Sequence, residues 1–143
     1  KEVGANYRKI EFNNIFKAYK EFASNVLGYE AQFEVEGGSK TVDLCLQNIQ
    51  ARNRMSLTYM LAQLELTSRK MPGFLLVVTS SNNDESLRGY LTKYDCSSGD
   101  LCPIGSLSKN ALKDYLRWNG SNGIKFVDSI LNATPTAELT PLK

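Results

Sequence analysis

A block of small polar side chains follows a short apolar run in the middle of the sequence. The run covers the five residues 74–78, and seven hydroxyl, amide and acid side chains follow it, from Thr79 to Glu85. Such a run between turn residues predicts a strand that is buried on both faces, as in a parallel sheet. Ligands of open α/β sheets bind beyond the carboxyl ends of the strands, so a binding site is expected here. The same residue types also cap helices, and that alternative stays open.

The chain contains no histidine, which limits the chemistry it can perform. Ser-His-Asp and Cys-His catalysis are excluded. Three cysteines without a C-x-x-C pair are poor candidates for a zinc site. Any reaction must use carboxylates, lysine, arginine, hydroxyls and the reactivity of a cofactor. We expect the cysteines, Cys45, Cys96 and Cys102, to be the reduced thiols of a cytoplasmic protein.

Length and composition indicate one ordinary globular domain. The chain has 143 residues, of which 42% are hydrophobic and 22% are charged. A net charge of +2 creates no field that favours nucleic acid or an acidic membrane as a partner. No apolar run approaches the roughly 20 residues of a membrane span. An enzyme or a small-molecule binding module remains.

Helices are expected on both sides of the polar block. Apolar residues at three- and four-residue spacing predict a helix over 12–27, with its N-cap at Asn13-Asn14 and a terminal glycine at Gly28. We expect its aromatic stripe to pack in a core. The residues before it, 6–12, are a weak strand candidate. Two further helices are predicted after the block, over 109–120 and 124–131.

A long helix is predicted before the polar block. Residues 29–41 lose the helical period and indicate a surface loop. Thr41 is a plausible N-cap for a helix that continues through Ser68 without glycine or proline. Apolar side chains nearly surround this helix, so we expect it to be covered by a sheet on one side and by a second subunit on the other.

Three sequence blocks carry a resemblance to a known family. The blocks are LQNIQARNRM at 46–55, the stretch from Ser80 to Lys109 with its GYLTKYD and PIG segments, and PTAEL at 135–139. In order and spacing they closely resemble NAD synthetase, most of all the eukaryotic glutamine-dependent type. Together they span about two thirds of the chain, and a match of this length is specific.

The resemblance implies a fold and an incomplete domain. The implied fold is α/β, the Rossmann-like three-layer α/β/α arrangement of the N-type adenine-nucleotide pyrophosphatases. The family's phosphate-binding loop, Ser-Gly-Gly-x-Asp-Ser, does not occur in the sequence, and Asp-Ser does not follow the paired glycines Gly37-Gly38. The amidase domain, which supplies ammonia from glutamine, is not represented either. We expect residues 1–143 to be a partial ligase domain of a longer chain, without turnover of its own.

The resemblance also implies substrate-binding residues. Arg52, Lys93 and Asp100 match contacts to nicotinic acid adenine dinucleotide, the contact of Arg52 crossing the dimer interface. A guanidinium suits this role because it stays charged and presents paired donors to phosphate or carboxylate. By residue type alone, Arg52 could equally be a solvated side chain at a helix edge. Arg54 has the weaker claim.

Further matches concern ATP and a metal. Ser80, Lys109 and Thr136 match ATP contacts, and Glu85 matches a magnesium ligand. Magnesium prefers oxygen ligands and shares its shell with substrate phosphates. Glu85 and Lys109 would be the catalytic residues, although Glu85 alone could be a first-turn acid of a helix. Gly99 marks a place where the backbone could closely approach the substrate.

The implied reaction is the ATP-dependent amidation of nicotinic acid adenine dinucleotide to NAD through an adenylated intermediate. Ammonia or glutamine would supply the nitrogen, and AMP and pyrophosphate would leave. The implied assembly is a homodimer. The alternative is a non-catalytic nucleotide-binding or dimerisation module, which would not need to keep these charged residues together. GMP synthetase and nucleic-acid binders fit the sequence less well.

Overall fold

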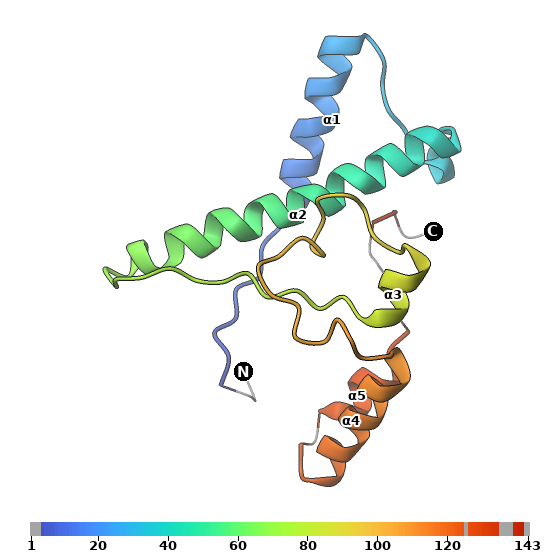
Figure 1. Ribbon diagram of the computed structural model, residues 1–143. Coiled ribbons are helices and arrows are strands. Elements are labelled where there is room, and N and C mark those ends of the chain that lie inside the picture. The colour runs from blue at the N-terminus through green and yellow to red at the C-terminus, as the bar shows by residue number, and fades with distance from the viewer. Residues whose placement is uncertain (1–3, 125, 135–138, 142–143) are drawn as a thin grey trace. The chain divides into compact units, whose positions relative to one another are not determined.

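The computed structural model describes residues 4–124, 126–134 and 139–141 of the chain (Figure 1). The chain divides into two compact units, one of Lys1–Ile49 with Thr140–Lys143 and one of Gln50–Leu139. The elements, in chain order, are α1 (Asn13–Leu27), the 3-10 turn η1 (Glu34–Glu36), α2 (Lys40–Ser68), α3 (Asn83–Arg88), α4 (Lys109–Ser121) and α5 (Val127–Asn132). The long helix α2 contributes residues to both units.

Helix α1 ends where the sequence predicted but begins differently. Gly28 has the left-handed φ of 61°, and its N–H donates to the Ser24 carbonyl over 2.8 Å. At the other end, Phe12 is the N-cap and its side chain makes no capping hydrogen bond. The predicted cap at Asn13-Asn14 is wrong, because both asparagines lie inside the first turn. Residues 6–12, the weak strand candidate, form no strand.

The aromatic stripe of α1 is only partly covered. The rings of Phe16 and Phe33 meet with their centres 5.8 Å apart, and Phe33 is buried. In contrast, Phe22 is 69% exposed and Leu27 is 71% exposed. The prediction that the whole stripe packs in a core is therefore wrong for this unit, in which α1 itself has no buried residue.

The predicted loop at 29–41 contains the turn η1 and ends in the cap of α2. The Ser39 hydroxyl accepts the Val42 N–H over 3.3 Å, and the Ser39 carbonyl accepts the Asp43 N–H over 2.9 Å. The cap is thus Ser39 and not Thr41, which lies in the first turn of the helix. Asp43 accepts the Glu34 N–H over 3.0 Å and so ties η1 to the start of α2.

The central apolar run, 74–78, does not form the predicted buried strand. Only Val77 is buried, and its four neighbours in the run are exposed. Within the described residues, the run makes one isolated parallel bridge, between Val78 and Leu101. The Thr79 N–H donates to the Leu101 carbonyl over 2.8 Å, and the Asp100 N–H donates to the Val77 carbonyl over 2.8 Å. A strand buried on both faces needs further strands and two covering layers, which these residues do not supply.

The last two helices form a small packed pair (Figure 1). Val127 of α5 is 2% exposed, and a Cβ at Gly120 of α4 would lie 3.6 Å from its side chain. Helix α4 continues through Gly120 to Ser121, slightly beyond the predicted end at 120. No helix among the described residues is long and apolar enough to cross a membrane.

Candidate functional site

Two of the predicted substrate-binding residues meet beside α2 in the second unit. The Nε atom of Arg52 donates to the backbone carbonyl of Lys93 over 2.9 Å. The Nζ atom of Lys93 lies 5.0 Å from the centre of the Tyr94 ring, a cation–π distance. Both side chains keep exposed surface, with Arg52 the more covered of the two. The Arg52 side chain therefore helps to fix the backbone of the loop that carries Lys93.

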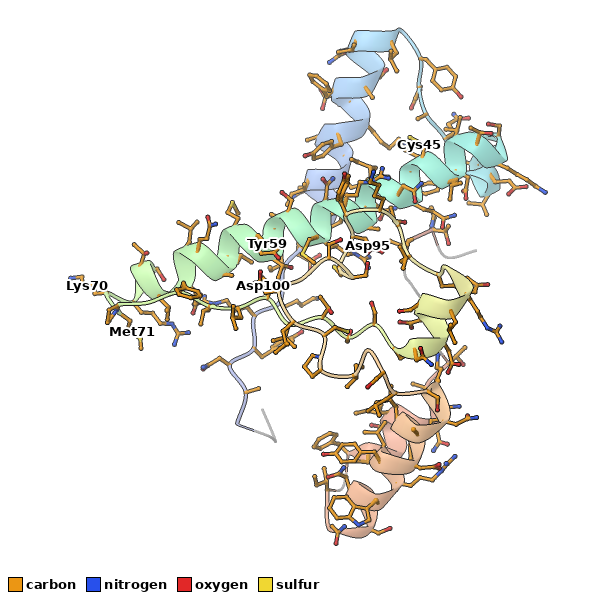
Figure 2. The ribbon with its side chains drawn as sticks, viewed as in Figure 1. Cys45, Tyr59, Lys70, Met71, Asp95 and Asp100 are labelled. Atoms are coloured by element: carbon orange, nitrogen blue, oxygen red, sulfur yellow. The ribbon has the colours of Figure 1, made fainter. Side chains whose placement is uncertain are left out.

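The third predicted residue, Asp100, is held by two donors. Its Oδ1 accepts from the Tyr59 hydroxyl over 3.1 Å, and its Oδ2 accepts from the Val77 N–H over 2.8 Å (Figure 2). The same hydroxyl lies 3.3 Å from the Ser98 carbonyl. Desolvation of the phenol, followed by the hydrogen bond and charge of Asp100, raises the pKa of Tyr59 above its usual value.

Arg52 and Tyr59 explain why α2 can position this loop. Tyr59 follows Arg52 by seven residues, which is about two helical turns, so both side chains lie on one face of α2. Arg52 holds the loop near Lys93, and Tyr59 holds it near Asp100. Arg52 and Tyr59 thus hold the loop that carries Lys93 and Asp100 against one face of α2.

The loop between these two points is closed by Asp95. Its Oδ2 accepts the Thr92 N–H over 2.9 Å, and its Oδ1 accepts the Ser97 N–H over 2.8 Å. Partial burial opposes ionisation of this carboxyl, but the hydrogen bonds from Ser97 and Thr92 and the charge of Arg52 outweigh it. The pKa of Asp95 therefore lies below the ordinary value of 3.8.

This depressed pKa gives an expected pH dependence. A carboxyl whose pKa is lowered by folding stabilises the folded state above its unfolded pKa, and that contribution is lost as the pH falls through its folded pKa. Asp95→Asn should lower the free energy of unfolding on the order of 1 kcal/mol at neutral pH, after allowance for solvent screening. The difference in unfolding free energy between this variant and the natural protein should disappear as the pH falls below 3.8, the ordinary pKa of an aspartate. Urea unfolding of both proteins across this range measures it, and a gap that is constant with pH would contradict it.

Gly99 is required by the protein's own packing. A Cβ at this position would overlap the Thr79 methyl group and would lie 2.8 Å from the Val77 carbonyl oxygen. Gly99 thus closely approaches residues 77–79, and the approach to a substrate stays a prediction. This contact sets the loop beside the parallel bridge.

A second group of predicted residues lies at the N-terminal ends of α3 and α4. Asn82 is the N-cap of α3: its Oδ1 accepts the Glu85 N–H over 3.1 Å, and its own N–H donates to Glu85 Oε2 over 3.1 Å. Asp84 Oδ2 accepts the Lys109 N–H over 2.7 Å, which ties the start of α4 to α3. The capping alternative considered for the polar block is thus correct for Asn82. Ser80 is exposed, and no hydrogen bond of the described residues joins it to Glu85 or Lys109.

The cap of α3 gives a second expected result. Asn82 is 5% exposed and satisfies the N–H of Glu85, so Asn82→Ala leaves that donor unpaired. We expect the free energy of unfolding to fall by about 0.5–2 kcal/mol. Asn82→Asp retains an acceptor and serves as the matched control. Urea unfolding measures both variants, and an equal loss from both would rule out capping as the cause.

The carboxylates at this second group suit magnesium only when a substrate supplies ligands as well. No group of three or more His, Cys, Asp or Glu side chains that could hold a metal occurs among the residues the structure describes. Glu85 uses Oε2 in the capping box, so Oε1 is the oxygen that could face a metal. Magnesium is commonly held by one or two carboxylates together with substrate phosphates, and Glu85 fits that arrangement.

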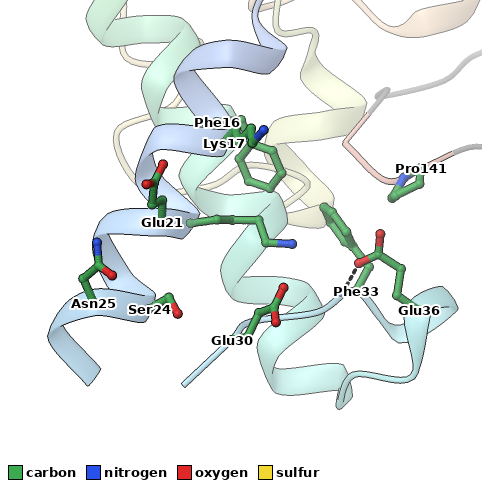
Figure 3. Close-up of a pocket in the computed structure, with 10 residues that line it drawn as sticks. Phe16, Lys17, Glu21, Ser24, Asn25, Glu30, Phe33, Glu36 and Pro141 are labelled. Atoms are coloured by element: carbon green, nitrogen blue, oxygen red, sulfur yellow. Dashed lines mark hydrogen bonds between the residues drawn. The ribbon is translucent and has the colours of Figure 1, made fainter. Parts of the chain in front are cut away.

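The first unit carries an open groove of its own. Its volume is about 540 Å³, and Figure 3 shows among its lining residues the apolar Phe16, Phe33 and Pro141 and the charged Lys17 and Glu30. None of the predicted site residues lines it. The site is therefore assigned to the second unit on the basis of its contacts and not on the basis of this groove.

Two residues that organise the site, Tyr59 and Asp95, were not predicted from the sequence. Tyr59 could have been noticed from its seven-residue spacing to Arg52. Asp95 could have been noticed as an aspartate two residues before Ser97, a spacing typical of a turn closed by its own side chain. The predicted ATP contact Thr136 lies outside the described residues.

Comparison with known proteins assigns this chain to a family. The profile of the family described as NAD synthase matches residues 1–143, and the chain belongs to that family. A glutamine-dependent NAD(+) synthetase of Dictyostelium discoideum is 45% identical over 143 residues, which are 99% of this chain and 20% of that protein. The chain thus spans about a fifth of the length of the curated relative it matches.

Solved structures show the fold. A glutamine-dependent NAD(+) synthetase from Cytophaga hutchinsonii superposes with a TM-score of 0.70 and 27% identity, over 96% of this chain and 22% of that one. A glutamine-dependent NAD+ synthetase from Acinetobacter baumannii, in complex with ADP, gives a TM-score of 0.64 at 19% identity, over 96% of this chain and 23% of that one. These likenesses confirm the predicted fold class, of which this chain contains a part.

Proposed function

We propose that this chain is part of the ligase domain of a glutamine-dependent NAD synthetase. The observation that carries the proposal is that α2 holds the loop with Lys93 and Asp100 next to Arg52. Arg52 donates a hydrogen bond to the Lys93 carbonyl, and Tyr59 donates one to Asp100. The chain belongs to the NAD synthase family, and by resemblance to NAD synthetases these three residues match dinucleotide contacts. A dimerisation module without a nucleotide site would have no reason to position all three.

The first group of residues would bind nicotinic acid adenine dinucleotide. Arg52 uses Nε for the Lys93 carbonyl, so its terminal guanidinium nitrogens remain for phosphate or carboxylate. Lys93 has an exposed ammonium above the Tyr94 ring and adds a second positive charge. Asp100 is oriented by Tyr59 and Val77 and can accept a hydroxyl of the substrate with its remaining lone pairs.

The second group would serve ATP. Glu85 would hold magnesium together with substrate phosphates, and the ion would offset charge on the departing pyrophosphate. Lys109 would add a point charge near the same phosphates, and Ser80 and Thr136 would contribute hydroxyls. The ADP complex of the Acinetobacter baumannii enzyme supports a nucleotide site in this fold.

The proposed reaction joins a carboxylate to ammonia at the expense of ATP. A nicotinate carboxylate oxygen of the dinucleotide attacks the α-phosphorus of ATP, and the bond to pyrophosphate breaks. Ammonia then attacks the carbonyl carbon of the resulting acyl adenylate, loses a proton, and displaces AMP to give NAD. The side chains contribute positioning and charge neutralisation, because adenylation already turns a poor leaving group into a good one.

The proposal includes partners that this chain does not contain. Ammonia would come from glutamine through an amidase domain of the same longer chain, and the Ser-Gly-Gly-x-Asp-Ser loop would complete the phosphate site. Met60 and Leu64, both on α2 in the second unit, are 47% and 53% exposed, which supports a second copy of the protein as a dimer partner. We propose that residues 1–143 alone do not turn over.

The experiment that tests the function uses the complete natural protein. The purified protein should form NAD and AMP in equal amounts from the dinucleotide, ATP and magnesium, with either glutamine or ammonium as nitrogen source. The same assay on residues 1–143 should give no NAD. If the complete protein binds the dinucleotide but forms no NAD with either nitrogen source, the binding-module alternative replaces this proposal.

A further inference from the structure

The turn at residues 92–98 has a backbone that its own residues do not favour. Tyr94 has a positive φ of 68°, in the left-handed region that favours glycine. A non-glycine residue held there is strained and persists only when its surroundings fix it. The turn therefore needs an anchor, and it contains Lys93, which is assigned to the dinucleotide.

Asp95 provides that anchor from within the turn. Its two carboxylate oxygens accept from N–H groups on both sides, those of Thr92 at 2.9 Å and Ser97 at 2.8 Å. Backbone bonds run beside them, from the Asp95 N–H to the Thr92 carbonyl and from the Ser98 N–H to the Asp95 carbonyl, both 2.9 Å. One side chain thus closes both halves of the turn around Tyr94.

Charge links the turn to α2. The Nε atom of Arg52 reaches the Lys93 carbonyl, and its positive charge also stabilises the ionised Asp95. If Asp95 were lost, the turn would lose its internal acceptors and Arg52 would lose its negative neighbour. Both predicted dinucleotide ligands would then be less well positioned.

We propose that Asp95 is a positioning residue for the dinucleotide subsite, which holds the 92–98 turn against Arg52 and so presents Lys93 to the substrate. This inference rests on the proposed function. It predicts a selective effect, because Asp95 has no bond to Glu85, to Lys109 or to the caps of α3 and α4, which carry the proposed ATP site.

The test compares Asp95→Ala, Asp95→Asn and the control Asp114→Ala in the complete natural protein. Asp114 is an exposed aspartate of α4 whose partner is Arg117. Asp95→Ala should raise KM for nicotinic acid adenine dinucleotide about tenfold or more, with KM for ATP and kcat little changed. Asp95→Asn keeps one oxygen acceptor for the turn and should give a smaller rise. The control should match the natural protein.

The outcomes separate this inference from the function on which it rests. A natural protein that neither binds the dinucleotide nor forms NAD overturns both. An active natural protein whose Asp95→Ala variant matches the control, or whose two KM values rise together, overturns the inference alone. If Asp95→Ala does not fold, Asp95→Asn decides, and an unchanged dinucleotide KM in that variant refutes the positioning role.

Discussion

Replacing Lys109 with methionine is expected to lower kcat for NAD formation in the complete protein by about 100-fold or more, the usual loss when a preorganised charge is removed from a transition state. The side chain of Lys109 is exposed, while its backbone N–H binds Asp84 at the start of α4. The cap of α4 uses the Ser108 hydroxyl and the Ala111 N–H. None of these bonds involves the Lys109 ammonium, so the helix should form as before.

The Lys109→Met substitution should not destabilise the protein. A cation in the first turn of a helix faces the positive end of the helix dipole, so methionine should leave the melting temperature unchanged or slightly raised. Lys113, exposed on α4 one turn later, gives the matched control Lys113→Met. Steady-state kinetics and thermal unfolding of the two variants measure the effect. Equal activity of both would show that Lys109 has no part in the reaction.

Local patterns predicted α1, α2, α4 and α5, because the signals lie within these helices or directly at their ends, whereas α3 was not predicted. The glycine at the end of α1 and the run without glycine or proline in α2 were sufficient to place Gly28 and Ser68. Their beginnings were less certain. The sequence predicted Thr41 as the cap of α2, whereas the hydrogen bond from the Val42 N–H to the Ser39 hydroxyl shows that the cap is Ser39.

The apolar run 74–78 was the larger error, and its cause is physical. An apolar composition shows that a segment can be buried, but burial requires partners from elsewhere in the protein. Within the described residues, the run has one bridging partner, Leu101. The side chain of Phe74 is 78% exposed, so the described residues do not supply the partners that burial of this run would need.

The residues proposed for the site came from resemblance more than from pattern, and their substrate contacts stay predictions. Arg52, Lys93 and Asp100 came from the family match, and the structure places them together. Tyr59 and Asp95 came from neither source. Tyr59 matters through contacts with residues 39 and 41 positions away, and Asp95 through contacts inside an irregular turn. Such contacts follow from how the loop folds back on α2, which periodicity does not encode.

Gly99→Ala is expected to destabilise the protein by about 1–3 kcal/mol, the usual loss on overpacking a tight contact. The new Cβ would overlap the Thr79 methyl group and press on the Val77 carbonyl oxygen. That oxygen accepts the N–H groups of Asp100 and Leu101, at 2.8 and 3.3 Å. The substitution therefore strains the parallel bridge and displaces Asp100 at the same time, so the dinucleotide KM should also rise.

The neighbouring substitution Ser98→Ala is the matched control for Gly99. Ser98 is exposed and takes part through its backbone, whose N–H donates to Asp95 and whose carbonyl lies beside Tyr59, so alanine preserves these bonds. Urea unfolding and dinucleotide kinetics compare the two variants. If Gly99→Ala is as stable and as active as Ser98→Ala, residues 77–79 can move away from the loop without loss. The Val78–Leu101 bridge would then not be what holds Asp100 in place, and Tyr59 on α2 would have to do so alone.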